Sequence, residues 1–227
     1  MSTITVIGGT GYAGGHIVAE AGRRGHRVVV ASRSAKAPAT GAPHGVEYLP
    51  LDVLDATQLA AAISRSDVVV SALSPRAGLD GALGAVNRQI ADLVSRHGAR
   101  LLVVGGFSSL RREADGPRVI DEGFGPGDVV PDAEVAALIS EATQMNAILH
   151  DLISRDDELD WTFVSPGMEF GSHVPGERTG AYRLGTDGLV LVDENGRSAI
   201  GGADFAAAVL DVIDSDRAHR GHLAVAY

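Results

Sequence analysis

Residues 4–14 are Ile4-Thr5-Val6-Ile7-Gly8-Gly9-Thr10-Gly11-Tyr12-Ala13-Gly14, an apolar β-branched run followed at once by a glycine-rich turn. The apolar run predicts a short strand, and residues 15–24, with Ile17, Val18 and Ala21 on one face, predict a helix. A strand, a glycine-rich turn and a helix in this order form the fingerprint of a dinucleotide-binding site. One glycine permits the tight bend, one lets the backbone approach a pyrophosphate, and one lets helix and strand pack closely. We therefore expect residues 8–14 to bind the phosphates at the helix N-terminus, the alternative being a glycine-rich turn that binds nothing.

The rest of the chain alternates between strand-like and helical patterns. Continuous Val/Leu runs, which are typical of parallel strands buried on both faces, predict strands at 27–31, 47–51, 67–72, 100–104 and 160–164. Helical spacing of apolar residues predicts helices at 56–63, 87–97 and 132–153. This alternation predicts an α/β Rossmann fold with a doubly wound parallel sheet, in one domain over residues 1–227. Residues 168–195 are expected to form a small hairpin on the substrate side, at the C-terminal rim of the sheet.

The end of the second predicted strand bears on the choice of dinucleotide. Sites that bind NAD place an Asp or Glu about twenty residues beyond the glycines, on the ribose 2′-hydroxyl. Here the segment contains Ser32, Arg33, Ser34 and Lys36 and no carboxylate. An arginine can pair with a 2′-phosphate through its planar fork of donors, so the sequence favours NADP(H) over NAD(H). The alternative is that Arg33 and Lys36 are solvated loop charges.

Further cofactor contacts are expected where the neighbouring strands end, because ligands of open α/β sheets bind at that edge. Asp52 follows the third strand and is placed to meet the adenine amino group, or else to cap a helical turn. The remaining positions are Val53, Ala72, Leu73, Gly105, Ser165 and Pro166.

Composition excludes several classes of function. The net charge of -10 argues against a nucleic-acid partner, which needs a basic face. The absence of cysteine excludes disulfides, thiol catalysis and zinc–thiolate sites, and the eight histidines show no ligand spacing, so no metal site is expected. No apolar run approaches the ~20 residues that span a bilayer, and no basic segment precedes an apolar one near residue 1. We expect a soluble, cytoplasmic monomer or homodimer.

The chain resembles the NADH-flavin reductase group of atypical short-chain dehydrogenases/reductases. The resemblance covers essentially the whole chain and rests on the turn at residues 8–14, on Asp52-Val53, on residues 160–166, on Gly176-Glu177-Arg178-Thr179-Gly180 with Tyr182-Arg183-Leu184-Gly185, and on residues 224–227. More distantly the chain is similar to flavin reductase/biliverdin-IXβ reductase and to NmrA-type redox sensors. The resemblance implies a Rossmann domain that binds NAD(P)H and has a small substrate-side region.

The predicted fifth strand leads into Gly105-Gly106-Phe107-Ser108-Ser109, where the group usually has a Gly-Gly-Ala-Gly-Ser type of turn. Ser109 aligns best with the family serine, and Ser108 aligns nearly as well. The stretch 107–131 that begins here is rich in Gly, Pro, Asp and Arg, and it predicts a functional loop or a lid.

Standard short-chain dehydrogenases use a Tyr-x-x-x-Lys pair, in which the lysine lowers the tyrosine pKa. The only lysine here is Lys36, and no tyrosine has a lysine three or four residues on. Flavins and quinones accept hydride into a conjugated ring and take their proton from solvent, so they need orientation more than acid catalysis. We therefore expect hydride transfer from NADPH to such a planar acceptor, with Ser109 and Tyr182 as candidate catalytic groups and Ser165 as a further candidate to bind its carbonyl. The alternative is that all three hydroxyls only satisfy backbone groups. The competing expectation is a non-catalytic, NmrA-like NADP sensor.

Overall fold

The computed structural model describes residues 1–123, 132–174, 176–215 and 220–227. These residues contain an eight-stranded sheet in the order β3-β2-β1-β4-β5-β6-β8-β7, in which every neighbouring pair is parallel except β7 and β8. The strands are β1 (Thr3–Ile7), β2 (Arg27–Ser32), β3 (Val46–Pro50), β4 (Val68–Ser71), β5 (Arg100–Val104), β6 (Trp161–Pro166), β7 (Arg183–Gly185) and β8 (Gly221–Ala226).

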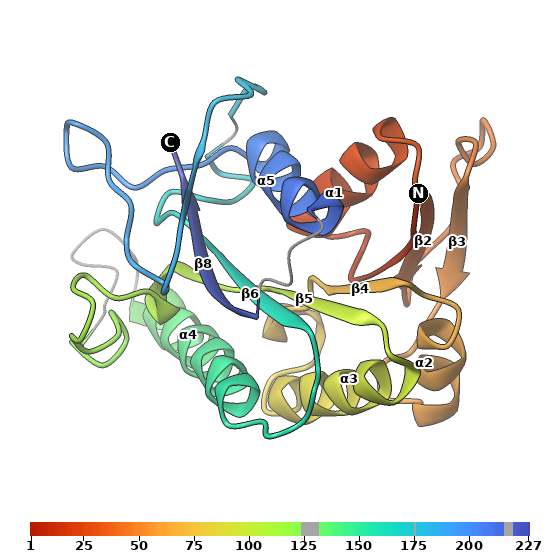
Figure 1. Ribbon diagram of the computed structural model, residues 1–227, viewed down its shortest axis with the longest axis horizontal. Coiled ribbons are helices and arrows are strands. Elements are labelled where there is room, and N and C mark those ends of the chain that lie inside the picture. The colour runs from red at the N-terminus through yellow and green to blue at the C-terminus, as the bar shows by residue number, and fades with distance from the viewer. Residues whose placement is uncertain (124–131, 175, 216–219) are drawn as a thin grey trace.

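Helices cover both faces of this sheet (Figure 1). On one face lie α1 (Tyr12–Arg23) and α5 (Gly202–Asp214), which pack side by side. On the other lie α2 (Ala56–Ile63), α3 (Leu83–His97) and α4 (Asp132–Ile153). Two short 3₁₀ turns, η1 (Pro75–Ala77) and η2 (Phe107–Ser109), follow β4 and β5. The predicted doubly wound Rossmann fold is confirmed.

The core consists of two apolar layers, one on each face of the sheet. Alternate residues of each central strand enter opposite layers, so that Ile7 contributes to the layer under α2, α3 and α4, whereas Val6 contributes to the layer under α1 and α5. A strand buried on both faces is apolar along most of its length, which is why β4 and β5 are almost continuous runs of Val and Leu.

The strand order reverses direction between β1 and β4, which lie side by side in the middle of the sheet. Open α/β sheets bind ligands beyond the carboxyl ends of the strands at such a switch point. Gly8 follows β1 and Ala72 follows β4, and Ala72 N–H donates to the Ile7 carbonyl at 2.8 Å. The fold therefore places the glycine-rich turn at the position where a ligand is expected.

Several elements differ from the sequence-based expectation. Helix α1 begins at Tyr12 rather than at residue 15, because Gly14 and Gly15 lie inside its first turn. Helix α3 begins four residues before the predicted start. Among the described residues of 168–195, no two strands pair as the expected hairpin. β7 pairs with the distant strand β8, and Leu189 forms an isolated bridge with Arg111. Neither α5 nor β8 was predicted as an element.

Part of the predicted loop 107–131 is ordered against the sheet. The Val119 N–H donates to the Leu110 carbonyl and the Ile120 N–H to the Ser108 carbonyl, so the loop returns to the 3₁₀ turn from which it leaves. Residues 124–131, where the rest of the expected lid falls, lie outside the described residues. Within the described part of the chain, no helix is both long and apolar enough to cross a bilayer.

Candidate functional site

The glycine-rich turn approaches its neighbours so closely that a Cβ would clash at three glycines, Gly8, Gly9 (2.9 Å from the Val6 carbonyl oxygen) and Gly14. Gly8 has φ +83°, and a Cβ there would lie 2.5 Å from the carbonyl oxygen of Ala72. A Cβ on Gly14 would lie 2.3 Å from the carbonyl oxygen of Gly8. Gly11, the N-cap of α1, is more open, with the same oxygen 3.3 Å away, and no described side chain caps the helix there. The turn thus leaves the start of α1 open toward a ligand, as a pyrophosphate site requires.

A pocket of about 220 Å³ lies beside this turn. It extends from the turn past the ends of β2, β3 and β4. Nine of the expected cofactor positions line it, namely Gly8, Thr10, Gly11, Ser32, Arg33, Asp52, Val53, Ala72 and Leu73. Ser34, Leu51, Leu54, Ser74, Gly78 and Leu79 complete the lining.

The polar end of the pocket is formed by the residues after β2. Thr10 Oγ1 donates to Ser32 Oγ at 3.0 Å, which ties the glycine-rich turn to this end. The Arg33 guanidinium reaches across toward η1, where a Cβ on Gly78 would lie 3.7 Å from Nη1. Lys36, the other candidate cation, does not line the pocket. A hydroxyl and a guanidinium side by side are suited to bind a phosphate ester.

Asp52 lines the pocket, and it is not the cap of α2. Its Oδ1 accepts the Leu54 N–H at 3.0 Å in a local turn. The cap of α2 is Asp55, whose Oδ1 accepts the N–H groups of Thr57 and Gln58. Asp52 therefore does not cap α2, and its contact with adenine stays a prediction.

The remaining cofactor positions lie outside the pocket lining. Gly9 lies on a groove between α1, β2 and β3, and Gly14 is buried inside α1. The Tyr12 hydroxyl accepts the Gly202 N–H at 3.2 Å. Gly105 lies against the Phe163 ring, with no room for a Cβ, and Pro166 is buried at the end of β6. Ala13, partly buried, packs against the apolar layer under α1.

Ser109 is fully buried, with 0% of its surface exposed. Its carbonyl accepts a hydrogen bond from Arg118 Nη1 at 2.7 Å, whereas its Oγ has no partner among the described atoms. A side chain without exposed surface cannot contact a substrate unless its surroundings move. Ser108 is buried as well, so the structure brings neither serine to an accessible surface.

Ser165 is also buried, and it is held by a histidine. Ser165 Oγ lies 2.8 Å from His222 Nε2, and Arg118 Nη1 lies 3.4 Å from His222 Nδ1. Because an arginine can only donate, Nδ1 accepts and Nε2 carries the proton that is donated to Ser165. Burial, reinforced by Arg118 and Arg111, lowers the pKa of His222 to about 3, so the ring is neutral. Ser165 therefore belongs to an internal network.

Tyr182 lies on the α5 face of the molecule and is not part of the pocket lining. Its hydroxyl donates to Asp211 of α5. Burial, together with this hydrogen bond, raises the pKa of Tyr182 to about 12. A phenol with a raised pKa, already bonded to a carboxylate, is a poor proton donor, so its placement does not support the catalytic role suggested from the sequence.

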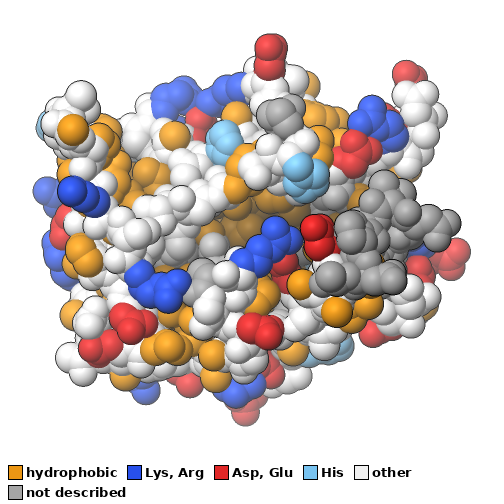
Figure 2. All heavy atoms as spheres, turned by 180° about the vertical axis from the view of Figure 1, so that it is seen from behind, with side chains coloured by type: hydrophobic (Ala, Val, Ile, Leu, Met, Phe, Trp, Pro, Cys, Tyr) orange, Lys and Arg blue, Asp and Glu red, His pale blue; other side chains and the backbone are white. Residues whose placement is uncertain are grey.

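The rim beyond β6 presents apolar surface. Met168 is 60% exposed, two residues after the strand. Phe170 packs edge-on against Tyr12, the first residue of α1, with ring centroids 5.3 Å apart. Figure 2 shows one face of the molecule with a hollow near its middle, floored by hydrophobic side chains and bordered by charged and histidine side chains.

The sequence did not identify four buried polar residues that connect distant segments around the site, namely Arg118, His222, Glu20 and Asp204. Arg118 and His222 act through contacts between segments about a hundred residues apart. Glu20 and Asp204 are buried carboxylates on α1 and α5. Arg178, Thr179 and Gly180, which belong to the motif at residues 176–180, contact these two carboxylates.

Three comparisons bear on this site. The sequence model of a family described as NAD(P)H-binding matches residues 8–216. The chain is 35% identical to the uncharacterised protein YwnB of Bacillus subtilis (strain 168) over 214 residues, which cover 93% of this chain and 92% of the relative.

Two solved structures are similar over their whole length. A protein from Streptococcus pneumoniae TIGR4, provisionally named an NADH-flavin reductase, has a TM-score of 0.80 at 25% identity, covering 100% of this chain and 99% of the other. A protein from Burkholderia pseudomallei, provisionally named an exported protein, has a TM-score of 0.81 at 34% identity, covering 100% of both chains.

Proposed function

Because the chain belongs to this NAD(P)H-binding family, we propose that it is a reductase that transfers hydride from NADPH to a planar conjugated acceptor, a flavin or a quinone. Binding of the dinucleotide is assigned to the turn at 8–14 and to the pocket beside it. The name of the Streptococcus pneumoniae neighbour supports a flavin as acceptor. The name of the Burkholderia neighbour refers to export, so the cytoplasmic location stays a prediction.

The observation that carries the choice of acceptor is the state of the candidate proton donors. Ser109 and Ser165 are buried and Tyr182 donates to Asp211, so none of the three offers a free hydroxyl at an accessible surface. A ketone would need such a group to protonate its oxygen as hydride arrives. A quinone or flavin delocalises the added electron pair over its ring and takes the proton from water, so correct orientation is sufficient. In this reaction NADPH loses a hydride to become NADP⁺, and the acceptor gains that hydride and one solvent proton.

The preference for NADPH over NADH rests on Arg33 and Ser32 at the polar end of the pocket. Arg33→Ala should weaken NADPH binding by about 1–3 kcal/mol, the range for hydrogen bonds to a charged group, and should leave NADH binding nearly unchanged. Lys36→Ala is the matched control, because Lys36 lies on the same loop outside the pocket lining. Fluorescence titration with both cofactors measures the effect, and equal affinities of the unaltered protein for NADPH and NADH would contradict the preference.

The reaction is tested with purified protein, NADPH and a panel of FMN and quinones, followed by the loss of NADPH absorbance. We expect consumption with at least one planar acceptor and none with simple ketones. Tight NADPH binding without consumption by any member of the panel would replace this proposal by a non-catalytic redox sensor.

A further inference from the structure

The segment that connects β6 to β7, residues 167–182, runs from the rim of the sheet across α1 and α5, and we call it the rim segment (Pro175 lies outside the described residues). It begins with the exposed Met168 and with Phe170 against Tyr12. Since Tyr12 directly follows Gly11, the rim segment borders the glycine-rich turn. Three carboxylates of α1 and α5 bind its second half.

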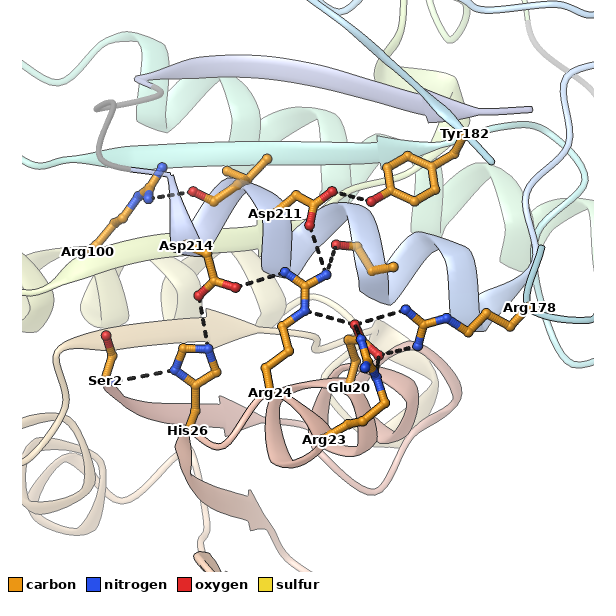
Figure 3. Close-up of polar contacts among 12 residues, drawn as sticks. Ser2, Glu20, Arg23, Arg24, His26, Arg100, Arg178, Tyr182, Asp211 and Asp214 are labelled. Atoms are coloured by element: carbon orange, nitrogen blue, oxygen red, sulfur yellow. Dashed lines mark hydrogen bonds and ion pairs between the residues drawn. The ribbon is translucent and has the colours of Figure 1, made fainter. Parts of the chain in front are cut away.

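The first contact joins the rim segment to α1. Arg178 donates through Nη1 to Glu20 Oε2 at 2.5 Å and through Nη2 to Oε1 at 3.2 Å (Figure 3). Glu20 is only 4% exposed, and it also accepts from Arg23 of its own helix and from Arg24, the C-cap of that helix. Hydrogen bonds from Arg23, and then from Arg178 and Arg24, hold the pKa of Glu20 well below its usual range, although burial opposes them. Arg178 is the only one of the three arginines that comes from outside α1 and its C-cap.

The second contact joins the rim segment to the start of α5. Asp204 is fully buried and accepts the Thr179 N–H at 2.9 Å, the Thr179 hydroxyl at 2.7 Å and the Gly180 N–H at 2.8 Å. The Tyr227 hydroxyl donates to the same carboxylate at 3.0 Å. A buried carboxylate is stable only when it is hydrogen-bonded in this way, so this site strongly selects one placement of the segment.

Two further features fix the segment on either side of these contacts. A Cβ on Gly176 would lie 2.9 Å from the Cα of Gly201, so the backbone meets the start of α5 directly. At the other end the Tyr182 hydroxyl donates to Asp211, which also pairs with Arg24 at 2.8 Å (Figure 3). Four of the five residues of the motif at 176–180, Gly176, Arg178, Thr179 and Gly180, thus attach the segment to α1 and α5.

We propose that Glu20 and Asp204 are positioning residues, and that the contacts of Arg178, Thr179 and Gly180 with them hold the rim segment as one wall of the acceptor site. The start of α1 binds the dinucleotide phosphates in the proposed function, on which this inference rests. Because the rim segment is attached to the same helix, the hydride donor and the surface around Met168 keep a fixed distance and orientation relative to each other. An acceptor that relies on orientation alone requires such a relation, since small misplacements cost rate steeply.

The test compares Arg178→Ala with Arg23→Ala. Both remove an arginine from Glu20, and in both cases two arginines remain to pair with the buried carboxylate, but only Arg178 attaches the rim segment. Hydrogen exchange followed by mass spectrometry should show about tenfold faster exchange in residues 167–182 of Arg178→Ala, the factor that corresponds to 1.4 kcal/mol. The glycine-rich turn should be unaffected in both variants, and Arg23→Ala should leave residues 167–182 unchanged. Unchanged exchange in Arg178→Ala would overturn the proposal, because the contact would then not hold the segment.

The second measurement separates placement of the acceptor from binding of the cofactor. With NADPH and FMN, Arg178→Ala should raise the KM for FMN about tenfold while the Kd for NADPH stays within about twofold. Arg178→Lys, which keeps the charge without the two-pronged geometry, should recover part of the loss. A parallel loss of NADPH affinity, or an unchanged KM for FMN, would contradict the positioning role. If the unaltered protein does not oxidise NADPH with FMN, the proposed reaction fails for that acceptor, and direct FMN titration of the same variants decides the inference.

Discussion

Two glycines of the turn at 8–14 have different functions: Gly14 is needed for the fold of the turn, and Gly11 is expected to leave space for the dinucleotide. We expect Gly14→Ala to disrupt the turn, because the new Cβ would lie 2.3 Å from the carbonyl oxygen of Gly8. Gly11→Val, whose Cβ has only that oxygen nearby at 3.3 Å, should keep the fold but lose dinucleotide binding, because the branched side chain occupies the space that the pyrophosphate needs.

Circular dichroism and a cofactor titration on each variant distinguish these two effects. The expected pattern is a folded, non-binding Gly11→Val and a destabilised Gly14→Ala. A Gly11→Val protein that still binds NADPH would refute the assignment of the turn.

The neutral His222 gives the protein a predictable pH dependence. Burial holds its pKa at about 3, whereas an unfolded histidine titrates near pH 6.5. Between pH 3 and pH 6.5 the histidine is protonated in the unfolded state and neutral in the folded state. The free energy of unfolding is therefore highest above about pH 6.5 and falls as the pH drops toward 3. At pH 5 the loss should be about 2 kcal/mol.

His222→Gln can still accept from Arg118 and donate to Ser165, but it does not titrate. Urea unfolding of both proteins at pH 5 and at pH 7 should therefore show a smaller pH effect in the variant. The pH range is chosen because carboxylates titrate mainly below it. The same pH effect in both proteins would show that His222 is not its source.

At the level of secondary-structure elements, helix α2 depends on its cap. Asp55 Oδ1 accepts two N–H groups at the start of α2, and Gln58 Nε2 donates to Asp55 Oδ2 at 2.7 Å. Asp55→Ala should cost about 1 kcal/mol of stability without changing cofactor affinity. Asp52→Ala is the informative comparison, since Asp52 lines the pocket and caps only a local turn. An Asp55→Ala variant with unchanged stability would show that the cap contributes little.

The elements that the sequence predicted are those whose signal is local. The bounds of α2 and α4 agree with their apolar periodicity, and the continuous Val/Leu runs predicted the central strands. Helix α5 was not predicted, although its two faces differ in polarity as strongly as those of α1; ten of its residues, Ala206, Ala207 and Ala208 among them, are buried.

The expected cofactor positions depend on local sequence signals, whereas the candidate catalytic residues depend on long-range contacts. Nine of the expected cofactor positions line one pocket because they lie at the glycine-rich turn and at the ends of successive strands, in an order that the fold class determines. The roles suggested for Ser109 and Tyr182 depended on which distant residues they meet, and those partners, Arg118 and Asp211, are set by tertiary packing. The pairing of β7 with β8 instead of with residues 189–192 is a third long-range feature of this kind.

At the scale of the whole molecule, helix α1 connects the pocket beside the glycine-rich turn with the rim segment. The pocket lies beside the glycine-rich turn, at the ends of β2, β3 and β4. The rim segment is bound to α1 and α5. Helix α1 belongs to both, with its start at the pocket and Glu20 further along. Binding of a dinucleotide to the start of α1 should consequently stabilise the folded protein as a unit.

Thermal unfolding measures this stabilisation directly. At a hundred times its Kd, NADPH should add about 2.7 kcal/mol to the free energy of unfolding, because it binds only the folded state. For a chain of this size that corresponds to a rise in Tm of roughly 5–10 °C. NADH at the same concentration, if it binds tenfold more weakly, should give about 1.4 kcal/mol and half the shift.

Gly11→Val should show no shift with either cofactor. Equal shifts with both would argue against recognition of the 2′-phosphate by Arg33, and no shift with either would mean that this pocket does not bind a nicotinamide dinucleotide.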